Sequence, residues 1–337
     1  MTIKDISVLT GYSVGTVSRV LNDQPNVSEK ARAAILEAAR KNGFRLNANA
    51  KQLKQQRSNT LLVVVKGTSN ELFGSLLETI QAKVASWPYP LVVDYVDEDE
   101  NEVLRGVQLC LERKPQGILF LGGNLENFRK HFGEVDVPCV LVTGDASELS
   151  FQNLSSVTTD DRQAGFLAVE HLARLGHRNI AMIGGVLGIS DITTLRFDGA
   201  IAACGEYGLE FDKNRDYVSG RFSYADGYRA VRTLMDRKCK FSAIFAMADV
   251  MAIGAIRALR DSGLRVPEDV SVIGLDGLAI GDYTVPRLAT VRQSVSKLAM
   301  RSIQILREQI EGDLDPRYET IAPVVDWKES TVAISET

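Results

Sequence analysis

Residues 11–22 read Gly-Tyr-Ser-Val-Gly-Thr-Val-Ser-Arg-Val-Leu-Asn, and this stretch decides the fold of the first part of the chain. Gly11 suits the left-handed conformation that ends a helix, and Ser13 is a favourable N-cap for a new helix directly after it. From Val17 to Leu21 the apolar residues repeat at i, i+3 and i+4, which predicts one buried helix face. The hydroxyl and arginine side chains between them are left on the other faces.

Two more helices are predicted around this stretch. The first begins at Thr2 and turns Ile6 and Leu9 inward, and the third runs from the N-cap Ser28 to near Gly43. The apolar stripe of the third helix consists of Ala31, Ile35, Leu36 and Ala39. A helix, a tight turn and a short polar helix make a helix-turn-helix pattern, whose second helix lies in the major groove of DNA.

The charge distribution also indicates DNA as a partner. Residues 1–60 contain 10 Lys and Arg against 4 Asp and Glu, a net charge of +6, so the remainder carries -10 within a total of -4. A basic module joined to an acidic body suggests a polyanionic partner for the module alone.

Individual side chains of the second helix suit different parts of DNA. Arg19 can bind a guanine edge or a phosphate, Val14 only an apolar feature such as a thymine methyl, and the hydroxyls suit phosphates. Gly15 either permits a close approach to DNA or is simply tolerated in the first turn. We expect DNA contacts from Ser13, Val14, Gly15, Thr16, Ser18, Arg19 and Asn22.

These motifs closely resemble the N-terminal signature of the lac repressor (LacI/GalR) family. The matching runs are Thr2-Ile3-Lys4-Asp5-Ile6, Gly11-Tyr12-Ser13, Thr16-Val17-Ser18-Arg19-Val20-Leu21-Asn22 and Asn26-Val27-Ser28. The resemblance implies a helix-turn-helix domain over residues 1–46.

Residues 47–57 contain no Gly or Pro and are polar nearly all round, which indicates a linker that becomes helical once docked. The resemblance implies that they form the hinge helix, within a linker at 47–58, and that Leu53 is a wedge in the minor groove at the operator centre. Gln52 stands where family members often have Ser. We expect hinge contacts to DNA from Asn47, Ala50, Leu53 and Lys54.

From Thr60 onward, strand and helix patterns alternate. Strands are predicted at 61–65, 91–96, 117–121, 137–142, 180–183, 217–219, 243–246 and 270–274. Helices are predicted at 72–86, 102–113, 163–175, 195–207, 225–235 and 251–262. Two runs of βαβ units imply an α/β body, 59–337, of two doubly wound parallel-sheet lobes.

The chain is expected to pass between the lobes near 155–161 and to return through a helix at 297–311 and an extended segment at 320–325. The N-lobe is assigned about 59–157 plus 288–318, and the C-lobe about 158–287 plus 319–337.

Ligands bind such sheets at the carboxyl ends of the strands. Asp160, Asp249 and Asp276 follow predicted strands there, and for Asp249 we expect a helix N-cap rather than a ligand contact. Arg196 opens a helix, and Phe73 and Phe222 could stack on a ligand. These six residues are the expected effector-binding set.

The resemblance extends through the body. Among its motifs are Leu175-Gly176-His177-Arg178, Arg196-Phe197-Asp198-Gly199 and the run from Gly263 to Gly274. It implies a periplasmic-binding-protein-like effector domain that dimerises, with a sugar or sugar derivative as ligand. Two departures, Ala248 in place of Asn and Asn70-Glu71-Leu72-Phe73 in place of Asn-Pro-Phe-Phe, keep a phosphorylated sugar, a nucleoside or no natural ligand open.

Other classes of protein find little support. No apolar stretch reaches about 18 residues, and no secretory signal opens the chain, so we expect a cytoplasmic protein with no membrane partner. Cys110, Cys139, Cys204 and Cys239 are widely spaced, which favours buried thiols over a metal site. Nucleophile-elbow and phosphate-loop motifs are absent, so neither an enzyme nor a cofactor is expected.

The sequence therefore predicts a DNA-binding transcriptional regulator, most simply a repressor. A homodimer would read a pseudo-palindromic operator in double-stranded DNA under control of a small-molecule effector. The alternatives are a regulator that responds to a nucleoside, purine or phosphorylated ligand, and a ligand-binding protein without specific DNA readout.

Overall fold

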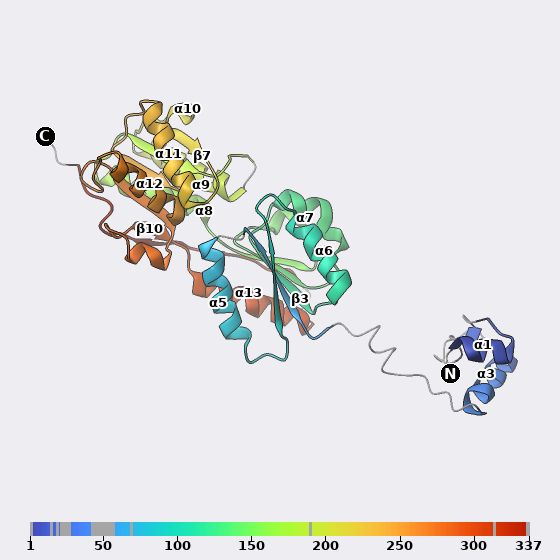
Figure 1. Cartoon of the computed structure of the whole chain (residues 1–337). Helices are drawn as coiled ribbons and strands as arrows, with labels where there is room; N and C mark the ends of the chain where they lie inside the picture. The colour runs from blue at the N-terminus through green and yellow to red at the C-terminus, as the bar shows by residue number, and fades with distance from the viewer. Residues whose placement is uncertain are drawn as a thin grey trace. The chain divides into compact units, whose positions relative to one another are not determined.

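The computed structural model describes residues 3–13, 16–17, 20, 28–41, 58–67, 70–188, 191–312 and 315–334. The chain divides into two compact units, Met1–Gln56 and Arg57–Thr337, which are called the head and the body below. The described part of the head is helical, and the body is built of two α/β lobes (Figure 1). Residues 47–57, which carry the predicted hinge helix, lie outside the described residues.

The head has a small apolar core. Its long helices are α1 (Ile3–Thr10) and α3 (Glu29–Lys41), and Gly11 follows α1 with a φ of 71°. The core consists of Ile6, Val17, Val20, Ile35 and Ala39, with Tyr12 packed against it. Leu9 and Leu36, both predicted to point inward, are instead 58% and 47% exposed. Each of these helices buries only a narrow stripe, and the two leucines fall outside it.

The N-lobe is built on sheet A, a sheet of six parallel strands. Its strand order is β11-β5-β4-β3-β1-β2. The strands are β1 (Leu61–Lys66), β2 (Leu91–Val96), β3 (Gly117–Leu121), β4 (Cys139–Val142), β5 (Leu154–Thr159) and β11 (Tyr318–Ile321). Helices α5 (Glu71–Val84) and α13 (Val295–Ile310) cover one face, and α6 (Glu102–Arg113) and α7 (Leu125–His131) the other (Figure 1).

The C-lobe repeats this plan on sheet B, ordered β12-β10-β9-β8-β6-β7. Its strands are β6 (Ile180–Gly184), β7 (Tyr217–Ser219), β8 (Ala243–Ala246), β9 (Ser271–Asp276), β10 (Ala289–Arg292) and the antiparallel β12 (Val324–Asp326). Helices α8 (Asp161–Arg174) and α9 (Asp191–Glu206) pack on one face, and α11 (Tyr224–Asp236) and α12 (Asp249–Asp261) on the other. A short α10 (Lys213–Asp216) precedes β7.

The chain passes between the sheets three times. It crosses from β5 to α8, from β10 to α13 and from β11 to β12. The assignment of 288–318 to the N-lobe and 319–337 to the C-lobe is therefore corrected at both ends. The backbone of β10 pairs with β9 in sheet B, and that of β11 pairs with β5 in sheet A. The sequence of a short strand does not indicate which sheet the strand joins, because backbone hydrogen bonds to a neighbouring strand decide its sheet.

Candidate functional site

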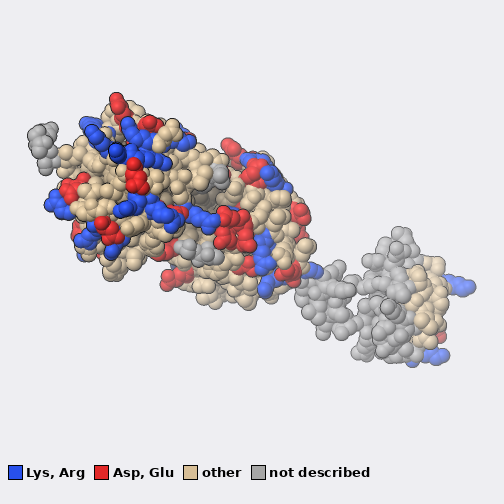
Figure 2. Space-filling model, turned by 45° about the horizontal axis from the view of Figure 1, so that its top comes forward, with Lys and Arg blue, Asp and Glu red and all other residues tan. Residues whose placement is uncertain are grey.

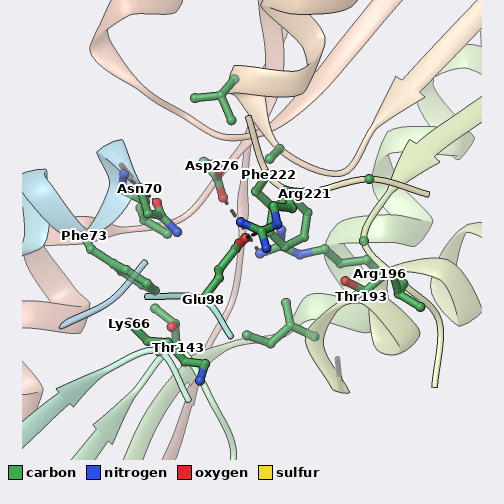
Figure 3. A pocket seen from close by; sticks show the side chains of 18 of the residues that line it. Lys66, Asn70, Phe73, Glu98, Thr143, Thr193, Arg196, Arg221, Phe222 and Asp276 are labelled. Carbon is green, nitrogen blue, oxygen red and sulfur yellow. Dashed lines mark hydrogen bonds and ion pairs between the residues drawn. The ribbon is translucent and has the colours of Figure 1, made fainter. Parts of the chain in front are cut away.

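A cavity of about 590 Å³ lies between the two lobes (Figure 3). The segments after β1, β2, β3 and β4 form its N-lobe wall, those after β6, β7, β8 and β9 form its C-lobe wall, and Gln293 follows β10. Because parallel strands all end at the same edge of their sheet, the two sheets present nine strand ends to one space. Its size is in the range of small-molecule sites.

Arg196 is the most firmly held cation of the cavity. Its side chain is nearly fully buried, and Nε donates to Oδ1 of Asp161 over 2.7 Å. One terminal nitrogen donates to the Met247 carbonyl over 2.6 Å, and the other lies 3.8 Å from Oδ1 of Asp276. Fixed from three sides, the guanidinium presents its remaining edge in one orientation, as recognition of a small ligand requires.

Asp276 is the last residue of β9 and has an unusual backbone. Its φ is 133°, a conformation that side-chain-bearing residues rarely adopt and that costs free energy. Nε2 of Gln293 donates to its Oδ1 over 2.8 Å. Burial raises the pKa of Asp276 to about 7, although Arg196 acts in the opposite direction. The strained turn thus keeps a carboxyl that titrates near neutral pH in the cavity wall.

Two phenyl rings provide the apolar surfaces. Phe73 comes from α5 in the N-lobe, and Phe222 from the segment between β7 and α11 in the C-lobe (Figure 3). Gly122 makes room for the first ring, because a Cβ there would lie 2.7 Å from Cζ of Phe73. Apolar walls with a few fixed polar groups are typical of sites for small organic ligands.

Comparison with known proteins accounts for both units. Residues 2–47 match the family of bacterial regulatory proteins of the lacI family, and residues 169–331 match the periplasmic binding protein-like domain. The chain is 32% identical over 323 residues to the HTH-type transcriptional regulator MalR of Clostridium butyricum, covering 94% of this chain and 95% of that protein. The chain belongs to the LacI family of transcriptional regulators.

Two further relatives cover nearly the whole chain. Catabolite control protein A of Priestia megaterium is 30% identical over 333 residues, covering 98% of this chain and 99% of that one. The solved complex of the transcriptional regulator CelR with cellobiose has a TM-score of 0.71 and 27% identity, covering 98% and 99% of the two chains. This LacI-family protein is thus a DNA-binding transcriptional regulator and not an enzyme, as the sequence predicted.

Two of the six expected effector residues of this LacI-family regulator do not reach the cavity. Asp160 caps α8 by accepting from the Gln163 N–H over 2.8 Å, and it lies at a separate cavity of about 250 Å³. Asp249 is fully buried, and its carboxylate accepts from the N–H groups of Gly277 and Leu278 and from the Thr290 hydroxyl. Both are removed from the proposed effector set because neither lines this cavity.

The expected N-cap role of Asp249 is also wrong. Ala248 occupies the N-cap position of α12, and no side chain caps that end. Asp249 instead holds the turn after Asp276, so it supports the cavity from behind. Glu71, which belongs to the Asn70-Glu71-Leu72-Phe73 run, does not line the cavity but accepts from the Tyr224 hydroxyl.

Several cavity residues were not predicted from the sequence. Among them are Lys66, Asn70, Glu98, Asp99, Thr143, Arg221, Asp226, Arg229 and Gln293. Two features of Thr143 mark it as a candidate ligand contact. Its backbone φ is 69°, and its buried hydroxyl has no hydrogen-bond partner among the described residues. The sequence offered no sign of it, since a single Thr after a strand is common.

In the head, only two of the expected DNA-binding residues of this LacI-family regulator are described. The Ser13 hydroxyl accepts from the Thr16 N–H over 3.2 Å, as an N-cap does, and lies 2.9 Å from the Thr16 hydroxyl. Both groups thus mark the start of the second helix. Val14, Gly15, Ser18, Arg19, Asn22, Asn47, Ala50, Leu53 and Lys54 lie outside the described residues.

Neither a membrane span nor a metal site occurs in the described ranges. No helix there is both long and apolar enough to cross a membrane. No group of three or more His, Cys, Asp or Glu side chains there could hold a metal ion. Cys110, Cys139 and Cys204 are buried and Cys239 is partly exposed, all as free thiols.

Proposed function

We propose that this regulator responds to a neutral sugar bound in the cavity, and that the bound sugar sets the affinity of the head for operator DNA. One observation carries the choice of a neutral ligand: every cation of the cavity wall already has a carboxylate partner. Lys66 pairs with Glu102, Arg196 with Asp161, Arg221 with Asp99, and Arg229 with Asp226. A phosphate or carboxylate ligand would compete with these carboxylates for the same N–H donors, and displacing a buried partner such as Asp161 would cost free energy.

Hydroxyl groups, by contrast, would find partners of both kinds. The Asp276 carboxyl accepts or donates depending on its protonation, Gln293 supplies an amide, and the Thr143 hydroxyl has no partner within the described structure. The faces of Phe73 and Phe222 offer apolar surface to the C–H face of a sugar ring. Phe73, Arg196, Phe222 and Asp276 therefore form our proposed effector set.

The ligand class is tested by isothermal titration of the full-length protein. The panel contains neutral mono- and disaccharides, sugar phosphates, and purine bases with their nucleosides. We expect at least one neutral sugar to bind with a dissociation constant in the micromolar to millimolar range and its phosphate ester to bind more weakly. Tight binding of a sugar phosphate or a purine, with no response to neutral sugars, would refute the proposal.

The regulator is further proposed to act in the cytoplasm as a homodimer on a pseudo-palindromic operator. The segment between β9 and β10 exposes Ile280, Tyr283 and Val285 to solvent at 44%, 83% and 73%. Three apolar side chains on one exposed segment are typical of a surface that another protein covers. A two-fold dimer would match an operator with two-fold symmetry.

We expect Tyr283→Asp to shift the protein from dimer to monomer, because a charge would be buried without a partner in such an interface. Light scattering after gel filtration measures the molar mass. Leu111→Asp is the matched control, since Leu111 is an equally exposed apolar residue, on α6. A dimer that survives Tyr283→Asp, or that Leu111→Asp disrupts equally, would place the interface elsewhere.

A further inference from the structure

Arg221 links the two lobes at the cavity. It lies just after β7 in the C-lobe, and its guanidinium pairs with Asp99 and lies 3.7 Å from Glu98, both in the N-lobe (Figure 3). The backbone N–H of Arg221 donates to Oδ2 of Asp226 over 2.6 Å. The arginine is therefore anchored on its own lobe while its charged end reaches the other.

A second bond joins the same two lobes through a different pair of elements, α11 and α5. The hydroxyl of Tyr224, in the first turn of α11, donates to the carboxylate of Glu71 at the start of α5. Tyr224 belongs to the C-lobe and Glu71 to the N-lobe, so this bond also spans the lobes. The loop before α11 and the helix that it opens are thus tied to the N-lobe at two points.

Charge explains why the lobes attract each other here. Asp97, Glu98, Asp99 and Glu100 are four consecutive acids in the N-lobe loop after β2. Burial and the neighbouring Asp99 and Asp97 raise the pKa of Glu98, and Arg221 opposes that shift. Arg221 thus relieves a repulsion within the loop. On the body surface in Figure 2, basic and acidic side chains meet beside a hollow between the lobes.

We propose that Arg221 is a latch: its ion pairs with Asp99 and Glu98 hold the lobes together over the cavity and slow the passage of small molecules into it. The latch acts whatever the effector is, so it stands apart from the proposal of a neutral sugar. Its strength is tunable by salt, because all three side chains are substantially exposed.

The rate at which a reagent reaches the cavity tests the latch. Ala248 lines the cavity, so Ala248→Cys places a thiol behind the latch in the full-length protein. Uncharged N-ethylmaleimide is the probe, since a charged reagent would respond to Arg221 directly. Mass spectrometry of the peptide that contains residue 248 excludes the partly exposed Cys239 from the measurement.

We expect Arg221→Ala to accelerate modification about two- to fivefold at low salt, the range set by exposed ion pairs. Raising the salt from about 0.05 M to about 0.5 M should increase the rate of thiol modification in the protein that carries Ala248→Cys alone. The rate should not change in the protein that also carries Arg221→Ala. Arg221→Glu should accelerate modification further, and adding Asp99→Arg to it should restore a slow, salt-sensitive rate. If Arg221→Glu combined with Asp99→Arg restores slow modification, the effect of Arg221→Glu comes from the lost ion pair and not from damage to the fold.

Arg257→Ala is the matched control, because Arg257 is an exposed arginine of the same lobe that pairs with Asp261 within α12. It should leave the rate of modification unchanged. Arg221→Ala at the parental rate, or equal acceleration by Arg257→Ala, would overturn the latch. Failure of the charge exchange to restore slow modification would overturn it as well.

Discussion

At the scale of single residues, the cavity depends on a compact group of buried charges. Arg196 is held by Asp161, while Asp276 accepts from Gln293 and lies 3.8 Å from Arg196. Asp249 sits behind them and fixes the backbone of the turn that follows Asp276. Burial, Asp249 and Asp161 all raise the pKa of Asp276 and only Arg196 among the charged neighbours lowers it, so protonation of this buried carboxyl is coupled to the fold.

The pH dependence of stability should therefore report on Asp276. Its pKa is raised in the folded protein, from 3.8 to about 7, so its contribution to stability is complete below its unfolded pKa and is lost as pH rises through about 7. We expect the free energy of unfolding to fall between about pH 5 and about pH 8, and Asp276→Asn to make that fall smaller. Urea unfolding followed by circular dichroism measures both.

Asp269→Asn is the control for this measurement. Hydrogen bonds from Arg265 lower the pKa of the exposed Asp269 to about 2, so it stays ionised over the whole range. That variant should keep the parental pH slope. If Asp276→Asn leaves the dependence of the unfolding free energy on pH unchanged, Asp276 is ionised in the folded protein at both ends of the pH range.

Site residues could be predicted only in part, for a physical reason. Asp160, Asp249 and Asp276 all follow strands and look alike in sequence, but only Asp276 lines the cavity. The orientation of a carboxylate depends on the N–H groups that donate to it, and these can come from segments distant in the sequence. The N–H of Gly277, for example, donates to Asp249. Arg221 and Thr143 were missed because their roles depend on the opposite lobe and on a backbone angle.

At the scale of elements, glycines set how closely α8 and α9 approach. A Cβ on Gly165 would lie 1.9 Å from the Arg196 carbonyl oxygen, and one on Gly199 would lie 1.8 Å from the Arg162 carbonyl oxygen. Each helix thus places a glycine against the other's backbone. Because Arg196 sits on α9, this contact also positions its side chain at the cavity.

We expect Gly165→Ala to destabilise the body by about 3 kcal/mol, because a backbone carbonyl cannot move aside as a side chain can. Gly205→Ala, on the partner helix α9, meets no atom within 4 Å and should instead stabilise by about 0.5–1 kcal/mol through helix propensity. Urea unfolding compares the two. Equal effects of both variants would show that the helices separate freely.

Buried strands made of apolar residues could be predicted from the sequence, whereas a buried strand made largely of polar residues could not. Leu61–Val65 is an unbroken apolar run and forms the buried strand it indicated. β5 reads Leu-Ser-Ser-Val-Thr-Thr and falls where the sequence predicts only a crossing between the lobes, near 155–161, yet all six residues are buried. Its hydroxyls are satisfied inside: Ser155 accepts from the Arg317 N–H, and Ser156 accepts from the Ala146 N–H. Polar residues with such distant partners give no periodic signal.

At the scale of the whole molecule, DNA binding and folding of the body should be separable. Leu53 lies outside the described residues, in the segment that joins the head to the body. We expect Leu53→Ala to lower operator affinity at least about tenfold, because a lost wedge no longer supports the bent DNA, and to leave body stability unchanged. Selection of bound sequences from a random duplex pool supplies the operator, and fluorescence anisotropy measures the affinity.

Gln52→Ala, next to Leu53 but polar, is the control and should weaken binding less. Unaltered affinity in Leu53→Ala would remove the wedge from the mechanism. A loss of body stability together with affinity would mean that the segment belongs to the body fold.

The three crossings between the sheets also have a consequence for synthesis on the ribosome. Sheet A gains its outermost strand, β11, only when residues 318–321 have been made, long after its other five strands. Until then the backbone of β5 is an uncovered edge, open to pairing with another nascent chain. A product that stops before residue 318 would therefore be prone to aggregate, because sheet A is complete only once β11 has been made.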